Sequence, residues 1–181
     1  MTPTPNFLDV PYIAQAERTH RMAYYEWGAS DNPNVLLCVH GLTRNARDFD
    51  FLAEALAQDF RIIALDMPGR GKSEWLTEPS EYNVTSYLQN LLHVFNALKL
   101  HQVHWLGTSM GGILGMMLAA AQPGCVKSLV LNDVGAWIPA SALRRLGKYV
   151  GVETEFPGYA AAERSLRAAY APFGITDERH W

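Results

Sequence analysis

A serine between two glycines is the residue of this sequence best placed to do chemistry. Gly107-Thr108-Ser109-Met110-Gly111 has the form Gly-x-Ser-x-Gly. This pattern is typical of a tight strand-to-helix turn that pushes a serine hydroxyl out as a nucleophile. The context agrees, because Val103 to Gly107 has strand character and a helix pattern runs from about Met110 to Ala121. The sequence therefore predicts Ser109 as a catalytic nucleophile.

The two glycines have a steric reason to be there. Gly107 and Gly111 each lie two positions from Ser109, where a Cβ would collide as strand and helix close together. The amide N–H of Met110 is expected to point toward the space in front of Ser109, at a helix N-terminus that favours negative charge. The alternative is a plain glycine-rich turn with an idle serine, and the flanking strand and helix patterns weigh against it.

Apolar runs that alternate with helix patterns surround this turn. The predicted strands are Thr19–Trp27, Val35–Val39, Arg61–Leu65, Val103–Gly107 and Val126–Leu131. Three helices are predicted. The first has an apolar stripe of Phe49, Leu52 and Leu56, which Phe51 and Ala55 widen. The second runs from Val84 to Leu98 and the third from Met110 to Ala121. Strands that alternate with helices predict an α/β fold, with a mostly parallel sheet and helices on both faces.

The pattern changes after residue 135, because no strand-like apolar run follows. Helices are expected near Ala140–Val150, near Ala160–Ala171 and from Thr176 onward. We therefore expect two domains, residues 1–135 and residues 136–181. Aromatic side chains in the second segment either line a pocket or pack the segment onto the sheet domain; they are Trp137, Tyr149, Phe156, Tyr159, Tyr170 and Phe173.

Composition limits the class of protein. The chain has 181 residues, of which 49% are hydrophobic and 18% charged, so it is expected to be globular. Its net charge of −3 argues against a general nucleic-acid binder. No apolar run approaches the roughly 20 residues of a membrane span, and no secretion-signal pattern is visible, so we expect a cytoplasmic protein. Cys38 and Cys125 give neither a disulfide framework nor a metal-ligand spacing.

Three motifs in order resemble the α/β-hydrolase fold of the type that bears a cap. They are His40-Gly41-Leu42, the loop from Asp66 to Ser73, and the elbow Gly107–Gly111, and the likeness covers about residues 20 to 181. The resemblance implies Ser109 as nucleophile and the backbone N–H groups of Leu42 and Met110 as the oxyanion hole. It also implies a small ester or related acyl substrate, no cofactor or metal, and a helical cap in residues 136–181.

The resemblance further implies an acid and then a histidine after the serine, with the histidine near the end of the fold. This sequence stops within the expected cap, and the Val126–Leu131 strand is left as an apolar edge. We therefore expect a fragment, a truncated product or one part of a split enzyme, in which a second polypeptide supplies the rest. The alternative is a catalytically inactive fragment or binding module.

Residues within the chain are weak substitutes for this pair. Asp133 follows a strand beyond the elbow and either orients a histidine or, more simply, fixes its own loop. His40 is expected to brace the oxyanion loop, and His180, the only histidine after the elbow, to lie on the surface. The substrate and the type of bond cleaved are not specified by the fold.

Two charged features suggest other ligands. Gly71-Lys72-Ser73 resembles the end of a phosphate-binding loop, but that motif needs a glycine where this chain has Asp66. Arg144, Arg145 and Lys148 are close in sequence and suit an acidic substrate, although solvated surface charge is the more common reason for such a cluster.

Overall fold

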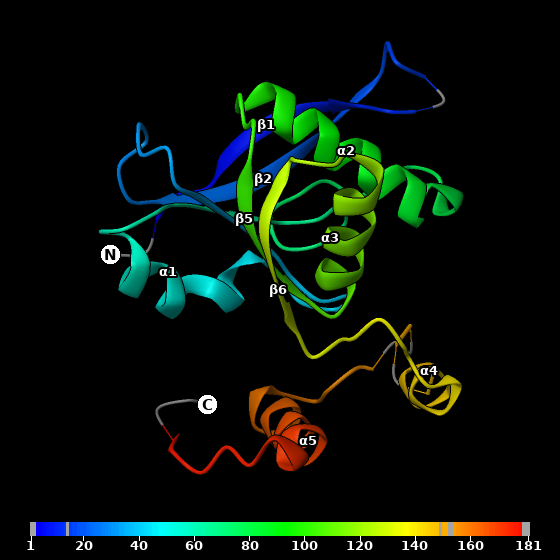
Figure 1. The fold of residues 1–181 in the computed structure, drawn as a ribbon. Coiled ribbons are helices and arrows are strands. Elements are labelled where there is room, and N and C mark those ends of the chain that lie inside the picture. Colours follow the sequence, from blue (N-terminus) through cyan, green and yellow to red (C-terminus); the bar gives the residue numbers. More distant parts are fainter. Residues whose placement is uncertain (1–2, 14, 149, 152–153, 179–181) are drawn as a thin grey trace. The chain divides into compact units, whose positions relative to one another are not determined.

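The computed structural model describes residues 3–13, 15–148, 150–151 and 154–178. Contacts divide the chain into two compact units, Met1–Ile138 (unit 1) and Pro139–Trp181 (unit 2). The sequence placed its domain boundary between residues 135 and 136. Figure 1 shows the fold of each unit.

Unit 1 is built on a six-stranded sheet with the order β1-β2-β4-β3-β5-β6. The strands are β1 (Asn6–Pro11), β2 (Thr19–Trp27), β3 (Val35–Val39), β4 (Arg61–Leu65), β5 (Val103–Thr108) and β6 (Val126–Asn132). Strands β4, β3, β5 and β6 pair in parallel, whereas β1 and β2 are antiparallel to their neighbours. The expected α/β fold with a mostly parallel sheet is confirmed.

Strand β1 was not predicted from the sequence. It is short, ends at a proline, and pairs only with β2, with Asn6 opposite Tyr24 and Val10 opposite His20. Most of its residues are exposed or half-buried, and only Val10 is fully buried. An edge strand that buries so little has a weak hydrophobic pattern, which is why the sequence alone did not indicate it.

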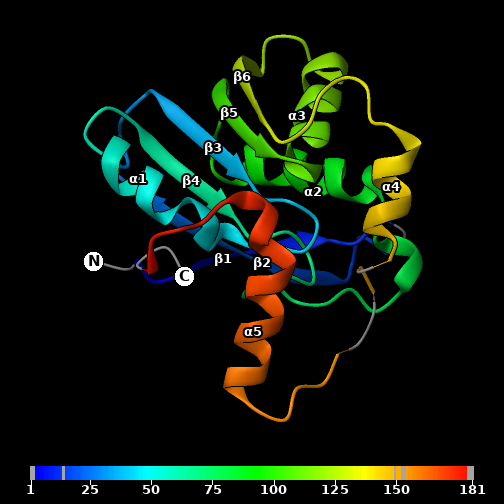
Figure 2. The ribbon, with the colours of Figure 1, turned by 90° about the horizontal axis from the view of Figure 1, so that it is seen from below.

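Helices cover both faces of the sheet (Figures 1 and 2). On one face lie α2 (Val84–Ala97), which follows the short 3₁₀ turn η2 (Pro79–Glu81), and α3 (Met110–Ala121). The other face is covered by the 3₁₀ turn η1 (Ala46–Phe49) and α1 (Asp50–Leu56). Each face has its own hydrophobic core, since side chains of a strand alternate between the two sides.

The predicted apolar stripe of α1 was partly wrong. Phe49 and Ala53 are buried, but Phe51 is 87% exposed and Leu52 is 39% exposed. Phe49 belongs to the 3₁₀ turn, which has about 3.0 residues per turn rather than 3.6. This change of period between η1 and α1 rotates Phe51 away from the sheet.

Unit 2 is helical in its described part. It contains α4 (Ala140–Leu146), α5 (Tyr159–Tyr170) and the 3₁₀ turn η3 (Ala171–Phe173). The predicted first helix, to Val150, was too long, because α4 ends at Leu146, just before Gly147. Most of the predicted helix from Thr176 lies outside the described residues; residues 174–177 are not helical, and Glu178 is in a helical turn. Tyr149 and His180, which the sequence analysis singled out, lie outside the described residues.

Among the described residues, no helix is both long enough and apolar enough to cross a bilayer.

Lys99 closes α2 in a backbone conformation that is costly for a residue with a Cβ. Its φ is +54°, and the next amide, Leu100 N–H, donates to Phe95 O at 2.8 Å. Glycine is the usual residue at this position of a helix end. We expect Lys99→Gly to raise the free energy of unfolding by about 1 kcal/mol, as measured by urea denaturation. Lys99→Ala retains the Cβ, so an equal gain in that variant would contradict the explanation.

Candidate active site

Ser109 lies at the turn between β5 and α3 with a strained backbone. Its φ is +48° and its ψ is −108°, which a residue with a Cβ rarely adopts. Hydrogen bonds fix the turn, because Ser109 N–H donates to Asn132 O at 2.9 Å and Gly112 N–H donates to Ser109 O at 2.9 Å. The predicted strand–serine–helix turn is therefore present, with a half-buried serine at its apex.

The glycines on either side of Ser109 stand where no side chain fits. A Cβ on Gly111 would lie 2.0 Å from the carbonyl oxygen of Val39, and one on Gly107 would lie 2.3 Å from Gly111 O. Both contacts are with backbone, which cannot move aside cheaply. The indole N–H of the fully buried Trp105 donates to Gly111 O at 3.0 Å and locks the same peptide. The structure therefore agrees with the inference from the sequence that a Cβ at either glycine would collide.

The loop after β3 lies beside the serine. A Cβ built on Gly41 would be 3.7 Å from Cβ of Ser109, so Gly41 and Leu42 adjoin the elbow. Met110 begins α3, where its amide has no partner in the helix. Among the described residues, neither the Leu42 N–H nor the Met110 N–H donates a hydrogen bond. The structure thus brings Ser109 close to the loop of Leu42 and leaves both amides available; their role as an oxyanion hole stays a prediction.

His40 fixes the orientation of this loop. Its Nε2 accepts the Met67 N–H at 3.0 Å, so the proton is on Nδ1, which donates to Gly41 O at 2.6 Å. Gly41 O also accepts the Arg44 N–H at 3.1 Å. Because the peptide group is planar, holding the Gly41 carbonyl aims the N–H of Leu42 in the opposite direction. His40 therefore positions the amide that the sequence predicted as an oxyanion donor.

The same contacts prevent His40 from acting as a general base. Both ring nitrogens are engaged, and the residue is fully buried. Burial lowers the pKa of His40 below its usual value, although the hydrogen bond to Gly41 opposes the shift. A neutral, fully bonded imidazole is a brace, as the sequence analysis expected.

The loop from Asp66 to Ser73 lies next to the end of the Leu42 loop and is tied to it through Asp66. Asp66 is buried, and its two carboxylate oxygens accept the N–H groups of Ala46 at 2.7 Å and Lys72 at 2.8 Å. A Cβ on Gly71 would lie 2.1 Å from Asp66 Oδ2. The loop thus folds around its own carboxylate, which occupies the place where a phosphate-binding loop would hold its phosphate. This geometry excludes the phosphate-loop alternative.

Residues that the sequence analysis missed also hold the site. Asn132 accepts the Ser109 N–H through its carbonyl, and its side-chain amide donates to Thr108 Oγ1 at 3.2 Å. Arg70 donates from Nε to Leu42 O at 3.0 Å. The positions of both residues in the sequence could have indicated this role. Asn132 ends the parallel strand next to β5, and Arg70 lies between two glycines of the Asp66–Ser73 motif.

The other described histidines lie elsewhere. His20 packs edge-on against Tyr12, and Nδ1 of His104 lies 2.7 Å from Ser128 Oγ. Asp133 has a φ of +56°, as a turn residue can, and its exposed carboxylate makes no hydrogen bond within the described residues. The structure therefore gives no support to the view that its side chain fixes the loop, and its role in orienting a histidine stays a prediction.

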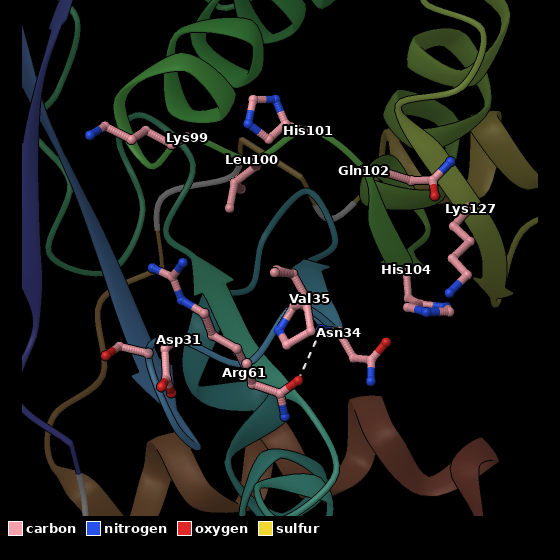
Figure 3. A pocket seen from close by; sticks show the side chains of 13 residues that line it. Asp31, Asn34, Val35, Arg61, Lys99, Leu100, His101, Gln102, His104 and Lys127 are labelled. Atoms are coloured by element: carbon pink, nitrogen blue, oxygen red, sulfur yellow. Dashed lines mark hydrogen bonds between the residues drawn. The ribbon is translucent and has the colours of Figure 1, made fainter.

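A hollow lies at the end of the parallel strands opposite to Ser109 (Figure 3). It measures about 370 Å³, and its lining includes the first residues of β3 and β4, Val35 and Arg61, together with His104 and Lys127 near the starts of β5 and β6. Ser109 follows the other end of β5, so this hollow is not the site of the predicted chemistry. Among the described residues, no group of three His, Cys, Asp or Glu side chains is arranged to hold a metal ion.

Comparisons with known proteins agree with this geometry. The family pattern described as "alpha/beta hydrolase fold" matches residues 34–166. The 3-hydroxybutyrate-oligomer hydrolase of Cupriavidus necator is 43% identical over 162 residues, which are 90% of this chain and 55% of that protein.

Two solved structures are similar over nearly all of this chain. A Rickettsia typhi protein assigned as a hydrolase superposes with a TM-score of 0.92 at 42% identity, covering 98% of this chain and 65% of its own. An alpha/beta hydrolase from Novosphingobium aromaticivorans superposes with a TM-score of 0.85 at 34% identity. The match covers 100% of this chain and 62% of that one. The chain thus spans little more than half of the Cupriavidus relative and less than two thirds of these two chains.

We expect Gly111→Ala to destabilise unit 1 strongly. Its Cβ would overlap the Val39 carbonyl at the crossing of β3 and α3, and overpacking against backbone typically costs about 3 kcal/mol. The free energy of unfolding from urea titration checks this. Gly135→Ala is the matched control, since its Cβ has no neighbour closer than 4.0 Å. Equal stability of the two variants would contradict the steric argument.

His40 is also expected to make stability depend on pH. Its folded-state pKa lies below the unfolded value of about 6.5, so the unfolded state binds more protons as pH falls. The stabilisation by neutral His40 is complete above that value and is lost as pH falls toward the folded pKa. His40→Asn should therefore be less stable at pH 8, and the difference from wild type should narrow toward pH 5 in urea titrations.

His20, whose pKa burial also lowers, titrates in both proteins and cancels in this comparison. A stability difference between His40→Asn and wild type that does not change with pH would contradict the assignment of a buried, neutral His40.

Proposed function

This chain belongs to the alpha/beta hydrolase fold family, and we propose that it is the Ser109-bearing part of a serine hydrolase. The proposed substrate is a small ester or a related acyl compound. The observation that carries the proposal is the strained Ser109 at the β5–α3 turn, beside a loop whose Leu42 N–H is unpaired in the described part of the chain. Backbone strain of this kind persists where surrounding structure enforces it, and it is concentrated at functional sites.

The proposed reaction proceeds through an acyl-enzyme. A histidine takes the proton of the Ser109 hydroxyl as its oxygen attacks the carbonyl carbon of the substrate. The negative charge that develops on the carbonyl oxygen is stabilised by the N–H groups of Leu42 and Met110. The alcohol leaves with the proton from the histidine, and water then cleaves the acyl–serine bond by the same route. This sequence of steps needs no metal and no cofactor.

We propose that the histidine and its acid lie in a part of the fold outside these 181 residues. The relatives are longer than this chain, which leaves room for such a part in each of them. It is supplied either by a continuation of the polypeptide or by a second polypeptide. Unit 2 is then part of the helical cap that selects the substrate. The name of the Cupriavidus relative, a hydrolase of 3-hydroxybutyrate oligomers, supports an ester as the substrate class.

A second candidate function is a catalytically silent binding module. It is favoured by one observation, since every described histidine is either engaged elsewhere or placed away from the elbow, as for His40 and His104. Reactivity of the serine separates the two candidates, because an idle hydroxyl does not react with a fluorophosphonate.

The assembled enzyme is this chain together with the part of the fold that supplies the histidine and the acid. In that enzyme we expect Ser109→Ala to lower kcat for a short-chain 4-nitrophenyl ester by at least about 10³-fold, because the nucleophile is lost. Intact-mass spectrometry should show one fluorophosphonate adduct on the wild type and none on the variant. The unfolding midpoint should stay close to that of wild type, since Ser109 Oγ makes no hydrogen bond within the described residues. Turnover retained by Ser109→Ala would refute the assignment.

A further inference from the structure

The guanidinium group of Arg70 is held by contacts on several sides. Its Nε donates to Leu42 O at 3.0 Å, and its Nη1 lies 2.7 Å from both Pro68 O and the hydroxyl of Tyr87. The same group lies over the rings of Tyr82 and Tyr87, 5.8 Å and 5.6 Å from their centroids. A side chain held by three hydrogen bonds and two aromatic rings has already lost most of its conformational entropy, so a ligand would bind to it without that cost.

The positive charge of Arg70 has no carboxylate partner within the described part of the chain. Its three acceptors are two carbonyl oxygens and a phenol, all neutral. Other arginines of unit 1 pair with acids: Arg21 with Glu74, Arg44 with Asp48, Arg47 with Asp50, and Arg61 with Glu26. Arg70 is partly buried, where an unpaired charge is more costly than at the surface, so an anion would stabilise it.

Part of the guanidinium remains available for such an anion. An arginine has five N–H donors, and Nε and Nη1 provide the three that are used here. Within the described residues, the two N–H groups of Nη2 have no acceptor. A guanidinium with one free amino group suits a carboxylate, which accepts charge-assisted hydrogen bonds.

The location of Arg70 relates this charge to the reaction. Its Nε holds the carbonyl of Leu42, the residue whose N–H is the proposed oxyanion donor, and the side chain of Leu42 is 41% exposed. Gly41, one residue earlier, adjoins Ser109. An anion bound to Nη2 would therefore lie near the oxyanion loop, displaced from the reacting carbonyl itself.

We propose that Arg70 binds a free carboxylate of the substrate and so selects esters that carry an acid group. This inference rests on the proposed serine hydrolase function and names its substrate class. An oligoester of a hydroxy acid has that chemistry, because the chain of ester bonds ends in a free carboxylate. The name of the Cupriavidus relative, a hydrolase of such oligomers, is consistent with the same class.

A simpler role for Arg70 is to hold Leu42 and nothing more. In that case its removal would disturb the oxyanion loop and weaken every substrate alike, whether charged or neutral. A carboxylate-binding role instead predicts an effect confined to ligands that carry the charge. A pair of ligands that differ only in that charge therefore distinguishes the two roles.

The test measures binding to the assembled enzyme with Ser109→Ala, so that no ligand is turned over. Calorimetric titration compares the linear dimer of 3-hydroxybutyrate with the carboxamide of the same dimer. We expect the acid to bind about 10- to 100-fold more tightly than the amide, as for a charge-assisted hydrogen bond. Arg70→Met should abolish the preference for the acid, so that the acid and the amide bind to this variant with equal affinity.

Two further variants complete the design. Arg70→Lys keeps the charge but not the fork of donors, so it should retain part of the preference for the acid. Arg18→Met is the control, because Arg18 is another arginine of unit 1 that stacks on a tyrosine and has no ion pair within the described residues. It should leave both affinities unchanged.

Equal binding of acid and amide to the protein with Arg70 intact would overturn the proposal, even if Arg70→Met failed to fold. A parallel loss for both ligands in Arg70→Met would also overturn it and would assign Arg70 to holding the loop. The proposed hydrolase function is tested separately, by turnover of 4-nitrophenyl butyrate in the enzyme that retains Ser109. If that ester is not turned over, the hydrolase proposal fails, and the comparison of acid with amide still decides whether Arg70 binds a carboxylate.

Discussion

The close approach of α3 to β3 is the constraint on which the site depends. Gly111 stands where a Cβ would lie 2.0 Å from the Val39 carbonyl, and this approach forces the chain to turn sharply at Ser109. The positive φ of Ser109 is the consequence of that turn, and the hydrogen bond from Trp105 to Gly111 O holds it. Backbone strain at a single residue is thus maintained by packing around it rather than by the residue itself.

The loop after β3, whose Leu42 N–H is the proposed oxyanion donor, is held by a connected set of buried polar groups. His40 joins Gly41 to Met67, and the neighbouring residue Asp66 accepts the N–H groups of Ala46 and Lys72. Each buried donor in this set has an acceptor, so burial does not leave it unpaired. Arg70 extends the set outward to Leu42, where it places a fixed positive charge beside the loop. A rigid loop and a fixed charge reduce the entropy that substrate binding must overcome.

Most elements of unit 1 were predictable from the sequence because they bury continuous or strongly periodic apolar residues. Strands β2, β3 and β4 and helix α3 have the predicted bounds, since each is punctuated by glycine, proline or polar residues. The errors lie where burial is slight or the helical period changes. Strand β1 buries only Val10, the 3₁₀ turn before α1 exposes Phe51, and α4 ends at a glycine that was not used as a stop.

Local chemistry in the sequence was sufficient to identify Ser109, the two glycines beside it and the loops of Leu42 and Asp66. Those motifs specify turns, and a turn is determined by residues close in the chain. The tertiary structure alone decided which loops meet and which donors stay free. The contact of Arg70 with Leu42, the lock of His40 on Met67 and the hydrogen bond from Ser109 to Asn132 join residues between 23 and 28 positions apart. Such contacts depend on the order of strands in the sheet, and the sequence pattern of a single strand does not specify that order.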